Sequence, residues 1–202
     1  WRWPGYPEIN TYVMSEEIFI WDLETAKTEH QFSPKLADAL VGILPADKMV
    51  LDFGCGKGSY LARLAQLGFK CIGYEGTDGI HEIADFHNIQ EGIDLSKPLD
   101  VAPLNGSVLC LEVAEHIPKQ YESVFLDNIT GPADALLVLS WALPGQGGCG
   151  HHNEQSAEYV INTIEDRGFR YIPDSTTQLR TAGGSELWWF RKSIYVFKKA
   201  EV

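Results

Sequence analysis

Residues 50–59 read Val-Leu-Asp-Phe-Gly-Cys-Gly-Lys-Gly-Ser, and this stretch decides which fold the sequence predicts. The apolar run over 49–53 is typical of a buried strand, and a helical pattern begins at Ser59. Between them glycine stands at every second position, where the chain must turn tightly and where absent side chains let a ligand approach the backbone. The stretch therefore predicts a strand, a ligand-binding turn and a helix in succession.

The spacing of these glycines narrows the class of ligand. A phosphate-binding loop would need Lys and then Ser or Thr after four intervening residues, and a dinucleotide-binding turn would need glycine where Ser59 stands. Asp52, directly before the turn, would repel a pyrophosphate, whereas a carboxylate is favourable beside an ammonium group. A ligand with a cationic amino acid part therefore suits the turn better than a nucleotide phosphate does.

An acidic residue also ends the second predicted strand, where Glu75 follows the run over 70–74. A carboxylate at this strand end can accept hydrogen bonds from both hydroxyls of a ribose. A solvated strand end explains Glu75 alone equally well, but together with the glycine turn it predicts a nucleoside-binding site.

Short apolar runs alternate with longer helical patterns from about residue 49 onward, which predicts an α/β fold with a parallel-type sheet. Strands are expected at 49–53, 70–75, 107–112, 134–141, 171–172 and 188–198, with a weak strand near Ile89. Helices are expected at 33–44, 59–67 and about 153–167. Residues 1–32 follow neither period and are expected to form a lid or to pack across the sheet edge, which leaves 33–202 as the main domain.

Length and charge limit the number of domains and the kinds of partner. A chain of 202 residues suits one domain with a continuous core, and its formal charge of −12 disfavours a partner bound through phosphates. Basic residues gather at 191–192 and 198–199, which a solvated edge strand explains better than a nucleic-acid patch. We therefore expect no nucleic-acid partner.

The cysteine pattern is typical of a protein in a reducing compartment, and the hydropathy pattern is typical of a chain without a membrane span. The scattered cysteines predict free thiols rather than a disulfide framework or a zinc site: Cys55, Cys71, Cys110 and Cys149. No apolar stretch of about 18 residues and no charged-then-apolar leader is present, so we expect a cytoplasmic protein with no membrane span. The chain begins at Trp1 rather than methionine, which we interpret as one domain of a longer multidomain protein.

The glycine turn and Glu75 resemble those of class I S-adenosylmethionine-dependent methyltransferases, and the resemblance covers about residues 34–198. It implies a Rossmann-like, seven-stranded, mostly parallel sheet with an antiparallel last strand and helices on both faces. It also implies S-adenosylmethionine as the cofactor, with the methionine part at the glycine turn, the ribose at Glu75 and the adenine beside Asp94-Leu95. The full set of cofactor-binding residues expected on this basis is Asp52, Gly54, Cys55, Gly56, Gly58, Glu75, Gly76, Asp94, Leu95 and Glu112.

A second motif, Leu-Glu-Val-Ala-Glu-His-Ile-Pro at 111–118, follows the apolar run over 107–110. It therefore stands at the carboxyl end of a central strand, where open α/β sheets bind their ligands. Two carboxylates and an imidazole within five residues are costly to crowd unless a divalent cation or solvent compensates them. Glu115 and His116 are accordingly candidate catalytic residues.

The spacing Glu-x-x-Glu-His resembles that of small-RNA 2′-O-methyltransferases and ubiquinone-pathway O-methyltransferases, where it contributes ligands to a divalent metal. In the RNA enzymes a histidine from a later loop completes the site. The metal ligands implied here, for Mg²⁺ or Mn²⁺, are Glu112, Glu115, His116, His151 and His152. Many relatives with this spacing need no metal, and His116, with an ordinary pKa of about 6.5, is then the general base that removes the hydroxyl proton.

The loop over 144–152 has four glycines in nine residues, which suits a segment that folds over a substrate. Adjacent histidines in a loop point in different directions, so only one is expected to face the site, and His151 is favoured as a third catalytic candidate. The loop also resembles that of methyltransferase domains found beside glycosyltransferases in polysaccharide assembly.

One main hypothesis and two rivals remain open at this stage. The main hypothesis is an O-methyltransferase that acts on a sugar or another polyol, because the chain is rich in Trp and Tyr, whose faces pack well against sugar rings. Its partner is then a small molecule or a glycan. The rivals are a methyltransferase acting on nitrogen or on RNA ends, and a non-catalytic module that binds S-adenosylmethionine.

Overall fold

The computed structural model describes residues 20–99 and 106–200 of the 202-residue chain. Within these ranges the strands are β1 (Met49–Phe53), β2 (Cys71–Tyr74), β3 (Ile89–Gln90), β4 (Gly106–Cys110), β5 (Ala133–Ser140), β6 (Phe169–Tyr171) and β7 (Ile194–Lys199). The α-helices are α1 (Leu23–Glu29), α2 (Pro34–Val41), α3 (Ser59–Gln66), α4 (Glu122–Thr130), α5 (Ala157–Glu165), α6 (Pro173–Gly184) and α7 (Phe190–Ser193). Three short 3₁₀ helices complete the described elements: η1 (Ile80–Glu82), η2 (Ala114–His116) and η3 (Lys119–Tyr121).

All seven strands belong to one sheet, in the order β3-β2-β1-β4-β5-β7-β6. Neighbouring strands are parallel, except that β7 runs antiparallel to both β5 and β6. This topology confirms the predicted Rossmann-like sheet with an antiparallel last strand. The strand order reverses between β1 and β4, and sheets of this kind bind their ligands in the crevice at the carboxyl ends of such strands.

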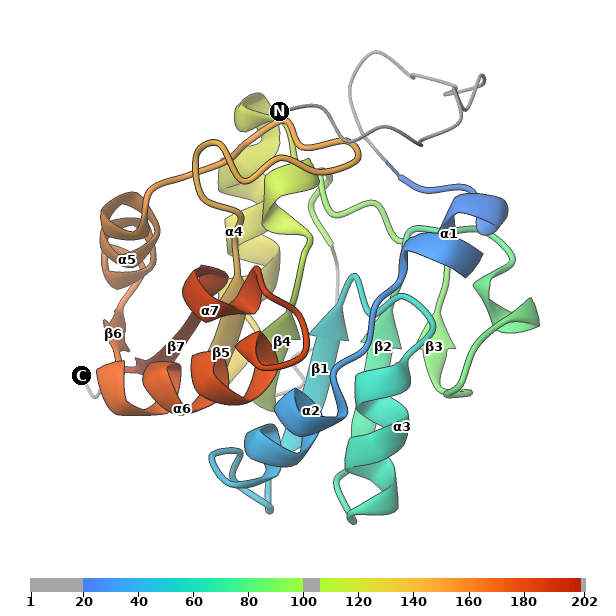
Figure 1. Cartoon of the computed structure of the whole chain (residues 1–202), viewed down its shortest axis with the longest axis horizontal. Coiled ribbons are helices and arrows are strands. Elements are labelled where there is room, and N and C mark those ends of the chain that lie inside the picture. The colour runs from blue at the N-terminus through green and yellow to red at the C-terminus, as the bar shows by residue number, and fades with distance from the viewer. Residues whose placement is uncertain (1–19, 100–105, 201–202) are drawn as a thin grey trace.

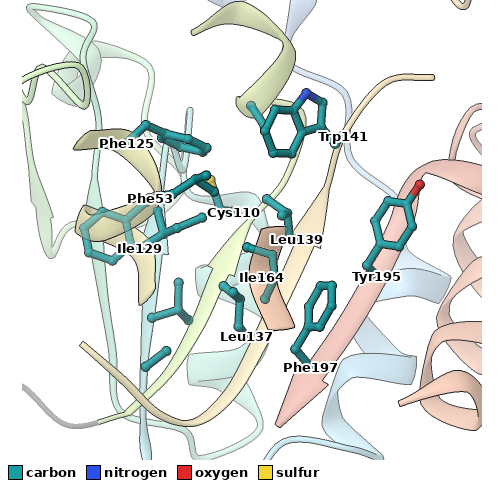
Figure 2. Close-up of a cluster of buried hydrophobic side chains, with 14 of the residues drawn as sticks. Phe53, Cys110, Phe125, Ile129, Leu137, Leu139, Trp141, Ile164, Tyr195 and Phe197 are labelled. Atoms are coloured by element: carbon teal, nitrogen blue, oxygen red, sulfur yellow. The ribbon is translucent and has the colours of Figure 1, made fainter. Parts of the chain in front are cut away.

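Helices cover both faces of the sheet, as predicted (Figure 1). Successive residues of β1 point to opposite faces, so Val50 packs with α2, α3 and α6, whereas Leu51 packs with α4 and α5. Figure 2 shows the hydrophobic cluster on the face of the sheet that α4 and α5 cover, in which Phe125 and Ile129 of α4 lie with Leu137 of β5. Because both faces are covered, the central strands are nearly continuous apolar runs.

The run over 188–198, predicted as one strand, is a strand only from Ile194 onward. The residues just before it form α7. Phe190 of this helix is buried against Gly183 of α6, where an added Cβ would lie 3.2 Å from the Phe190 side chain. Aromatic composition favours a strand, but this contact places the residues in a helical corner on the α6 face, so the prediction was wrong for them.

The helix predicted from about residue 153 to 167 begins only at Ala157. Ser156 caps it, because its hydroxyl oxygen accepts a hydrogen bond from the backbone N–H of Tyr159 at 3.1 Å. Asn153, which also suits a helix start by residue type, is buried, and its side chain binds Glu122 instead.

The N-terminal segment predicted over 1–32 is described from Ile20 onward and contains α1; residues 1–19 lie outside the described residues. The four cysteines are free thiols, as predicted. No helix within the described ranges is both long and apolar enough to cross a membrane.

Replacing Leu139 by Ala should destabilise the fold strongly. Leu139 is fully buried in β5 between β4 and β7, so the substitution leaves a cavity and should lower the free energy of unfolding by about 2–5 kcal/mol. Leu67→Ala is the matched control, because Leu67 is 45% exposed and loss of its side chain should cost less than about 0.5 kcal/mol. Urea denaturation measures both, and equal costs would contradict this packing.

Candidate active site

The glycine turn between β1 and α3 needs glycine at each of its three positions. Gly54, Gly56 and Gly58 have positive φ angles of 75°, 55° and 74°, which other residues rarely adopt. Close neighbours add to this requirement: a Cβ on Gly54 would lie 2.3 Å from the Val113 side chain, and one on Gly58 would lie 2.8 Å from Phe86. Side chains from other elements therefore pack closely against the turn, and a residue with a Cβ would not fit at these positions.

Glu75 fastens the end of β2 to this turn. Its carboxylate is buried and accepts hydrogen bonds from the backbone N–H groups of Gly56 at 2.7 Å and Thr77 at 2.9 Å. The two nucleoside-binding features predicted from the sequence, the turn and Glu75, are thus in direct contact.

Asp52 lies at the end of β1 with its side chain buried. Within the described ranges no group donates a hydrogen bond to its carboxyl group. Burial and the negative charge of Glu75 raise the pKa of Asp52 to about 8. A cationic group bound here would favour the ionised form, so the arrangement suits an ammonium ligand.

The segment before α2 contributes two rings that the sequence did not single out. The His30 imidazole lies over the glycine turn, where a Cβ on Gly56 would be 2.9 Å from it. The Trp21 ring packs against His30 with centroids 5.1 Å apart and forms a T-shaped contact with His116, with centroids 5.6 Å apart. These rings connect the turn with the acidic-histidine motif; only the general expectation of a lid over 1–32 hinted at them.

The acidic-histidine motif and the later loop meet at one point. Glu115 and His116 of η2 and His151 of the loop after β5 bring their ligand atoms within 4.8 Å of one another. The His116 and His151 rings are edge to face with centroids 5.2 Å apart. The three candidate catalytic residues of the sequence are thus together, and we call them the Glu115–His116–His151 cluster.

The carboxyl group of Glu115 is fully buried, and neither of its oxygens has a hydrogen-bond partner within the described ranges. Burial and the nearby Glu112 raise the pKa of Glu115 well above its ordinary value. A buried carboxyl group without donors is costly, and a bound cation is one way to compensate it.

Both histidines of the cluster are held through Nδ1. The Nδ1 of His116 lies 3.1 Å from the carbonyl oxygen of Gly150, which can only accept, so Nδ1 carries the proton and Nε2 the lone pair. The Nδ1 of His151 lies 3.0 Å from Oε1 of Glu154. Histidine ligands of metals commonly donate their second N–H to such oxygens. Burial, helped by the charge of His151, lowers the pKa of His116 to about 4, so its imidazole is neutral at physiological pH.

The structure does not place Glu112 and His152, the other two predicted metal ligands, in this cluster. Glu112 has a φ of 58°, and its Oε1 accepts a hydrogen bond from the Ser140 hydroxyl at 2.7 Å. Burial raises its pKa to about 7 despite that hydrogen bond. His152 is exposed to solvent.

Four further residues were predicted to bind the cofactor: Asp94, Leu95, Gly76 and Cys55. The backbone N–H of Ile93 donates to the carbonyl oxygen of Glu75 at 2.9 Å, which brings Asp94 beside this strand end. Partial burial would raise the pKa of Asp94, but hydrogen bonds from Lys97 and Ser96 hold it below its ordinary value. Leu95 belongs to the core, Gly76 packs against Ile20, and the Cys55 thiol lies 3.6 Å from the carbonyl oxygen of Gly56.

Comparison with protein families and curated proteins gives one consistent result. A family model for a methyltransferase domain matches residues 25–130. The chain is also 30% identical over 114 residues to the ubiquinone biosynthesis O-methyltransferase of Saccharophagus degradans, a match that covers 52% of this chain and 48% of that protein. The chain spans about half the length of the curated relatives it matches.

Solved structures share the fold at lower sequence identity. The magnesium protoporphyrin IX methyltransferase of Synechocystis PCC 6803, solved with bound S-adenosylhomocysteine, aligns with a TM-score of 0.56 at 19% identity over 88% of this chain and 83% of that one. The [4+2]-cyclase SpnF aligns with a TM-score of 0.60 at 14% identity over 83% of this chain and 81% of its own. The likeness shows a common fold, which alone does not set the reaction.

Replacing Asp52 by Asn should change how stability depends on pH. A folded pKa of about 8, above the unfolded value, means that the folded state holds an extra proton, so the free energy of unfolding falls as pH rises towards 8. Asp52→Asn removes this loss of stability and should raise the melting temperature at pH 8.5 by about 3 °C or more. Below pH 8.5 the melting temperature of the variant should depend less on pH than that of the unmodified chain.

Thermal melts from pH 5 to 8.5 measure the effect. Asp166→Asn, at an exposed position, is the control and should follow the unmodified chain. If the pH profile of Asp52→Asn also matched that of the unmodified chain, Asp52 would be ionised in the folded state.

Proposed function

The chain belongs to the methyltransferase-domain family, and from that membership we propose that it transfers a methyl group from S-adenosylmethionine to a hydroxyl oxygen. The observation that carries this proposal is the contact between the glycine turn and Glu75, next to the buried Asp52 carboxyl group. The curated relative described above acts as an O-methyltransferase by name, which supports oxygen as the acceptor atom.

The residues at the turn fit the proposed cofactor. Asp52 is buried and accepts no hydrogen bond within the described part of the chain, which suits the ammonium group of the methionine part. Gly54, Gly56 and Gly58 add no side chain to the turn beside it, and Glu75 would accept hydrogen bonds from the ribose hydroxyls. When bound, the cofactor supplies a methyl group on a sulfonium centre.

We also propose that the Glu115–His116–His151 cluster holds a divalent cation, Mg²⁺ or Mn²⁺. The fit rests on the carboxyl group of Glu115, which has no hydrogen-bond partner among the residues that the structure describes, and on two imidazoles whose Nδ1 atoms are already engaged. Such a cation would supply Lewis acidity towards an acceptor hydroxyl. Glu154 and the carbonyl of Gly150 orient the two rings.

The proposed acceptor is a sugar or another polyol with neighbouring hydroxyls. Trp21 stands beside His116, and an indole face in this position suits a sugar ring better than it suits a charged polymer. The formal charge of −12 disfavours an RNA acceptor, which would have to approach the same edge of the sheet.

A cofactor-binding module without methyl transfer is the second candidate. The likeness of the fold to that of a [4+2]-cyclase favours this second candidate, because the same fold there serves a reaction other than methyl transfer by name. Incubation with S-adenosylmethionine and a panel of glycosides separates the two candidates: methylated product supports the first, and binding without product across the panel supports the second.

Replacing Glu75 by Ala should weaken binding of S-adenosylhomocysteine about 10- to 100-fold, the range expected for hydrogen bonds to a charged group. Isothermal titration calorimetry gives the Kd. Glu158→Ala, an exposed change on α5, should leave the Kd within about twofold. An unchanged Kd for Glu75→Ala would remove the basis for the cofactor assignment.

Replacing His151 by Gln should abolish Mn²⁺ binding and lower methyl transfer by about 10-fold or more, because one of three ligands is lost. Electron paramagnetic resonance of free Mn²⁺ gives the affinity. His87→Gln, at an exposed site outside the cluster, is the control. If the unmodified chain bound no Mn²⁺, the metal part of the proposal would be wrong while the cofactor part stood.

A further inference from the structure

Asn153, at the end of the glycine-rich loop, is buried, and each of its polar groups has a partner. Its backbone N–H donates to the carbonyl oxygen of Glu115 at 2.9 Å, and its own carbonyl accepts from the Trp141 indole at 2.5 Å. Its side-chain amide donates to Oε2 of Glu122 at 2.8 Å and accepts from the Gln155 amide at 2.6 Å. Asn153 thereby joins η2, the end of β5 and α4 to the loop.

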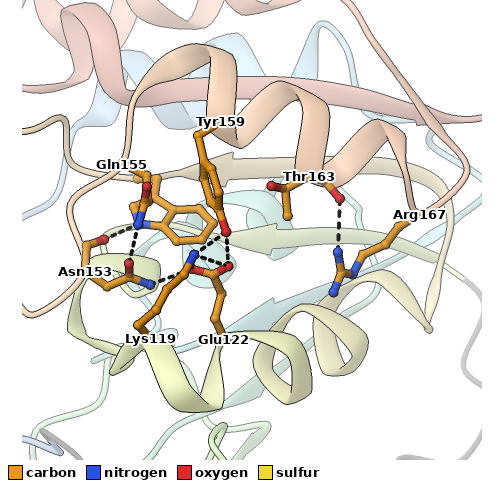
Figure 3. Close-up of polar contacts among 8 residues, drawn as sticks. Lys119, Glu122, Asn153, Gln155, Tyr159, Thr163 and Arg167 are labelled. Carbon is orange, nitrogen blue, oxygen red and sulfur yellow. Dashed lines mark hydrogen bonds and ion pairs between the residues drawn. The ribbon is translucent and has the colours of Figure 1, made fainter.

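Glu122 anchors this network from below, at the start of α4 (Figure 3). Its carboxylate also accepts hydrogen bonds from the Lys119 ammonium group at 2.8 and 2.9 Å and from the Tyr159 hydroxyl. Burial would raise the pKa of Glu122, but hydrogen bonds from Asn153, Lys119 and Tyr159 hold it below its ordinary value. An ionised, fully bonded Glu122 is a firm acceptor for the Asn153 amide.

The same network reaches the Glu115–His116–His151 cluster through the backbone. The N–H groups of His152 and Asn153 both donate to the carbonyl oxygen of Glu115, at 2.8 and 2.9 Å. A loop with four glycines in nine residues has many alternative conformations, so contacts of this kind are needed to hold it in one conformation. The position of His151 relative to η2 therefore depends on the residues that fix the loop end.

We propose that Asn153 and Glu122 are positioning residues: their side-chain hydrogen bond holds the loop against η2, so that His151 and the Gly150 carbonyl stay in place beside His116. The proposal rests on the proposed function only for the use of the cluster in catalysis. The placement itself does not depend on which reaction the cluster serves.

Reversal of the hydrogen bond tests this role. Asn153→Asp sets a carboxylate against Glu122 and should break the contact, whereas Glu122→Gln combined with Asn153→Asp lets the new amide donate to the new carboxylate. Asn162→Asp makes the same chemical change at an exposed position of α5 and is the matched control.

Two readouts respond to positioning rather than to folding. The first is the ¹⁵N NMR signature of the His116 ring, which should show Nδ1–H because Nδ1 faces the Gly150 carbonyl. The second is Mn²⁺ affinity measured by electron paramagnetic resonance. Circular dichroism and S-adenosylhomocysteine calorimetry verify that the fold and the glycine turn are intact.

Asn153→Asp is expected to lose the single Nδ1–H signature and to weaken Mn²⁺ binding about 10-fold or more, with S-adenosylhomocysteine affinity within about twofold. The double variant should regain both properties. A folded Asn153→Asp that keeps the signature, or a double variant without recovery, overturns the proposal.

If Asn153→Asp does not fold, Asn153→Ser is read in the same way, because its short side chain cannot span to Glu122. If the unmodified chain binds no Mn²⁺, the metal proposal fails, and the His116 signature alone then decides the positioning role.

Discussion

The structure depends on one electrostatic constraint: four acidic side chains are buried or nearly so at a single edge of the sheet. They are Asp52, Glu75, Glu112 and Glu115. Within the described ranges none of them forms an ion pair with Lys or Arg. Buried carboxylates cost several kcal/mol each unless they are compensated, so they take up protons, accept backbone hydrogen bonds or require cationic ligands. In the proposed function an ammonium and sulfonium cofactor and a divalent cation supply that missing positive charge.

The fold explains why these groups meet. Parallel strands end at the same edge, and the order reverses between β1 and β4, so the residues that follow them meet at this shared edge of the sheet. Two peripheral segments then cover it: the segment with Trp21 and His30 from one side, and the glycine-rich loop with His151 from the other. In Figure 1 this loop runs along the upper edge of the sheet, beyond the arrowheads of β4 and β5. The residues of the site therefore come from two sources. Some follow strand ends whose positions the hydrophobic core fixes, and others belong to peripheral segments whose positions depend on polar contacts.

This division also explains what the sequence could predict. Gly54, Gly56 and Gly58 were recognisable because their conformation requires glycine, and the central strands because burial on both faces makes them apolar. The helical corner at Phe190 and the late start of α5 could not be predicted from the sequence. Contacts between distant residues there override the local preferences of aromatic side chains and of Asn153. Trp21 and His30 carry no periodic signal, and their place in the site is set entirely by tertiary packing.

Proton release on cofactor binding tests the central claim most directly. Calorimetric titration of S-adenosylhomocysteine at pH 7, in buffers of different ionisation enthalpy, counts the protons released. Because the Asp52 carboxyl group holds a proton before binding, the unmodified chain should release about one proton and the Asp52→Asn variant markedly fewer. Absence of binding, or binding with the same proton release in both chains, would contradict the view that a cationic ligand compensates this buried acid.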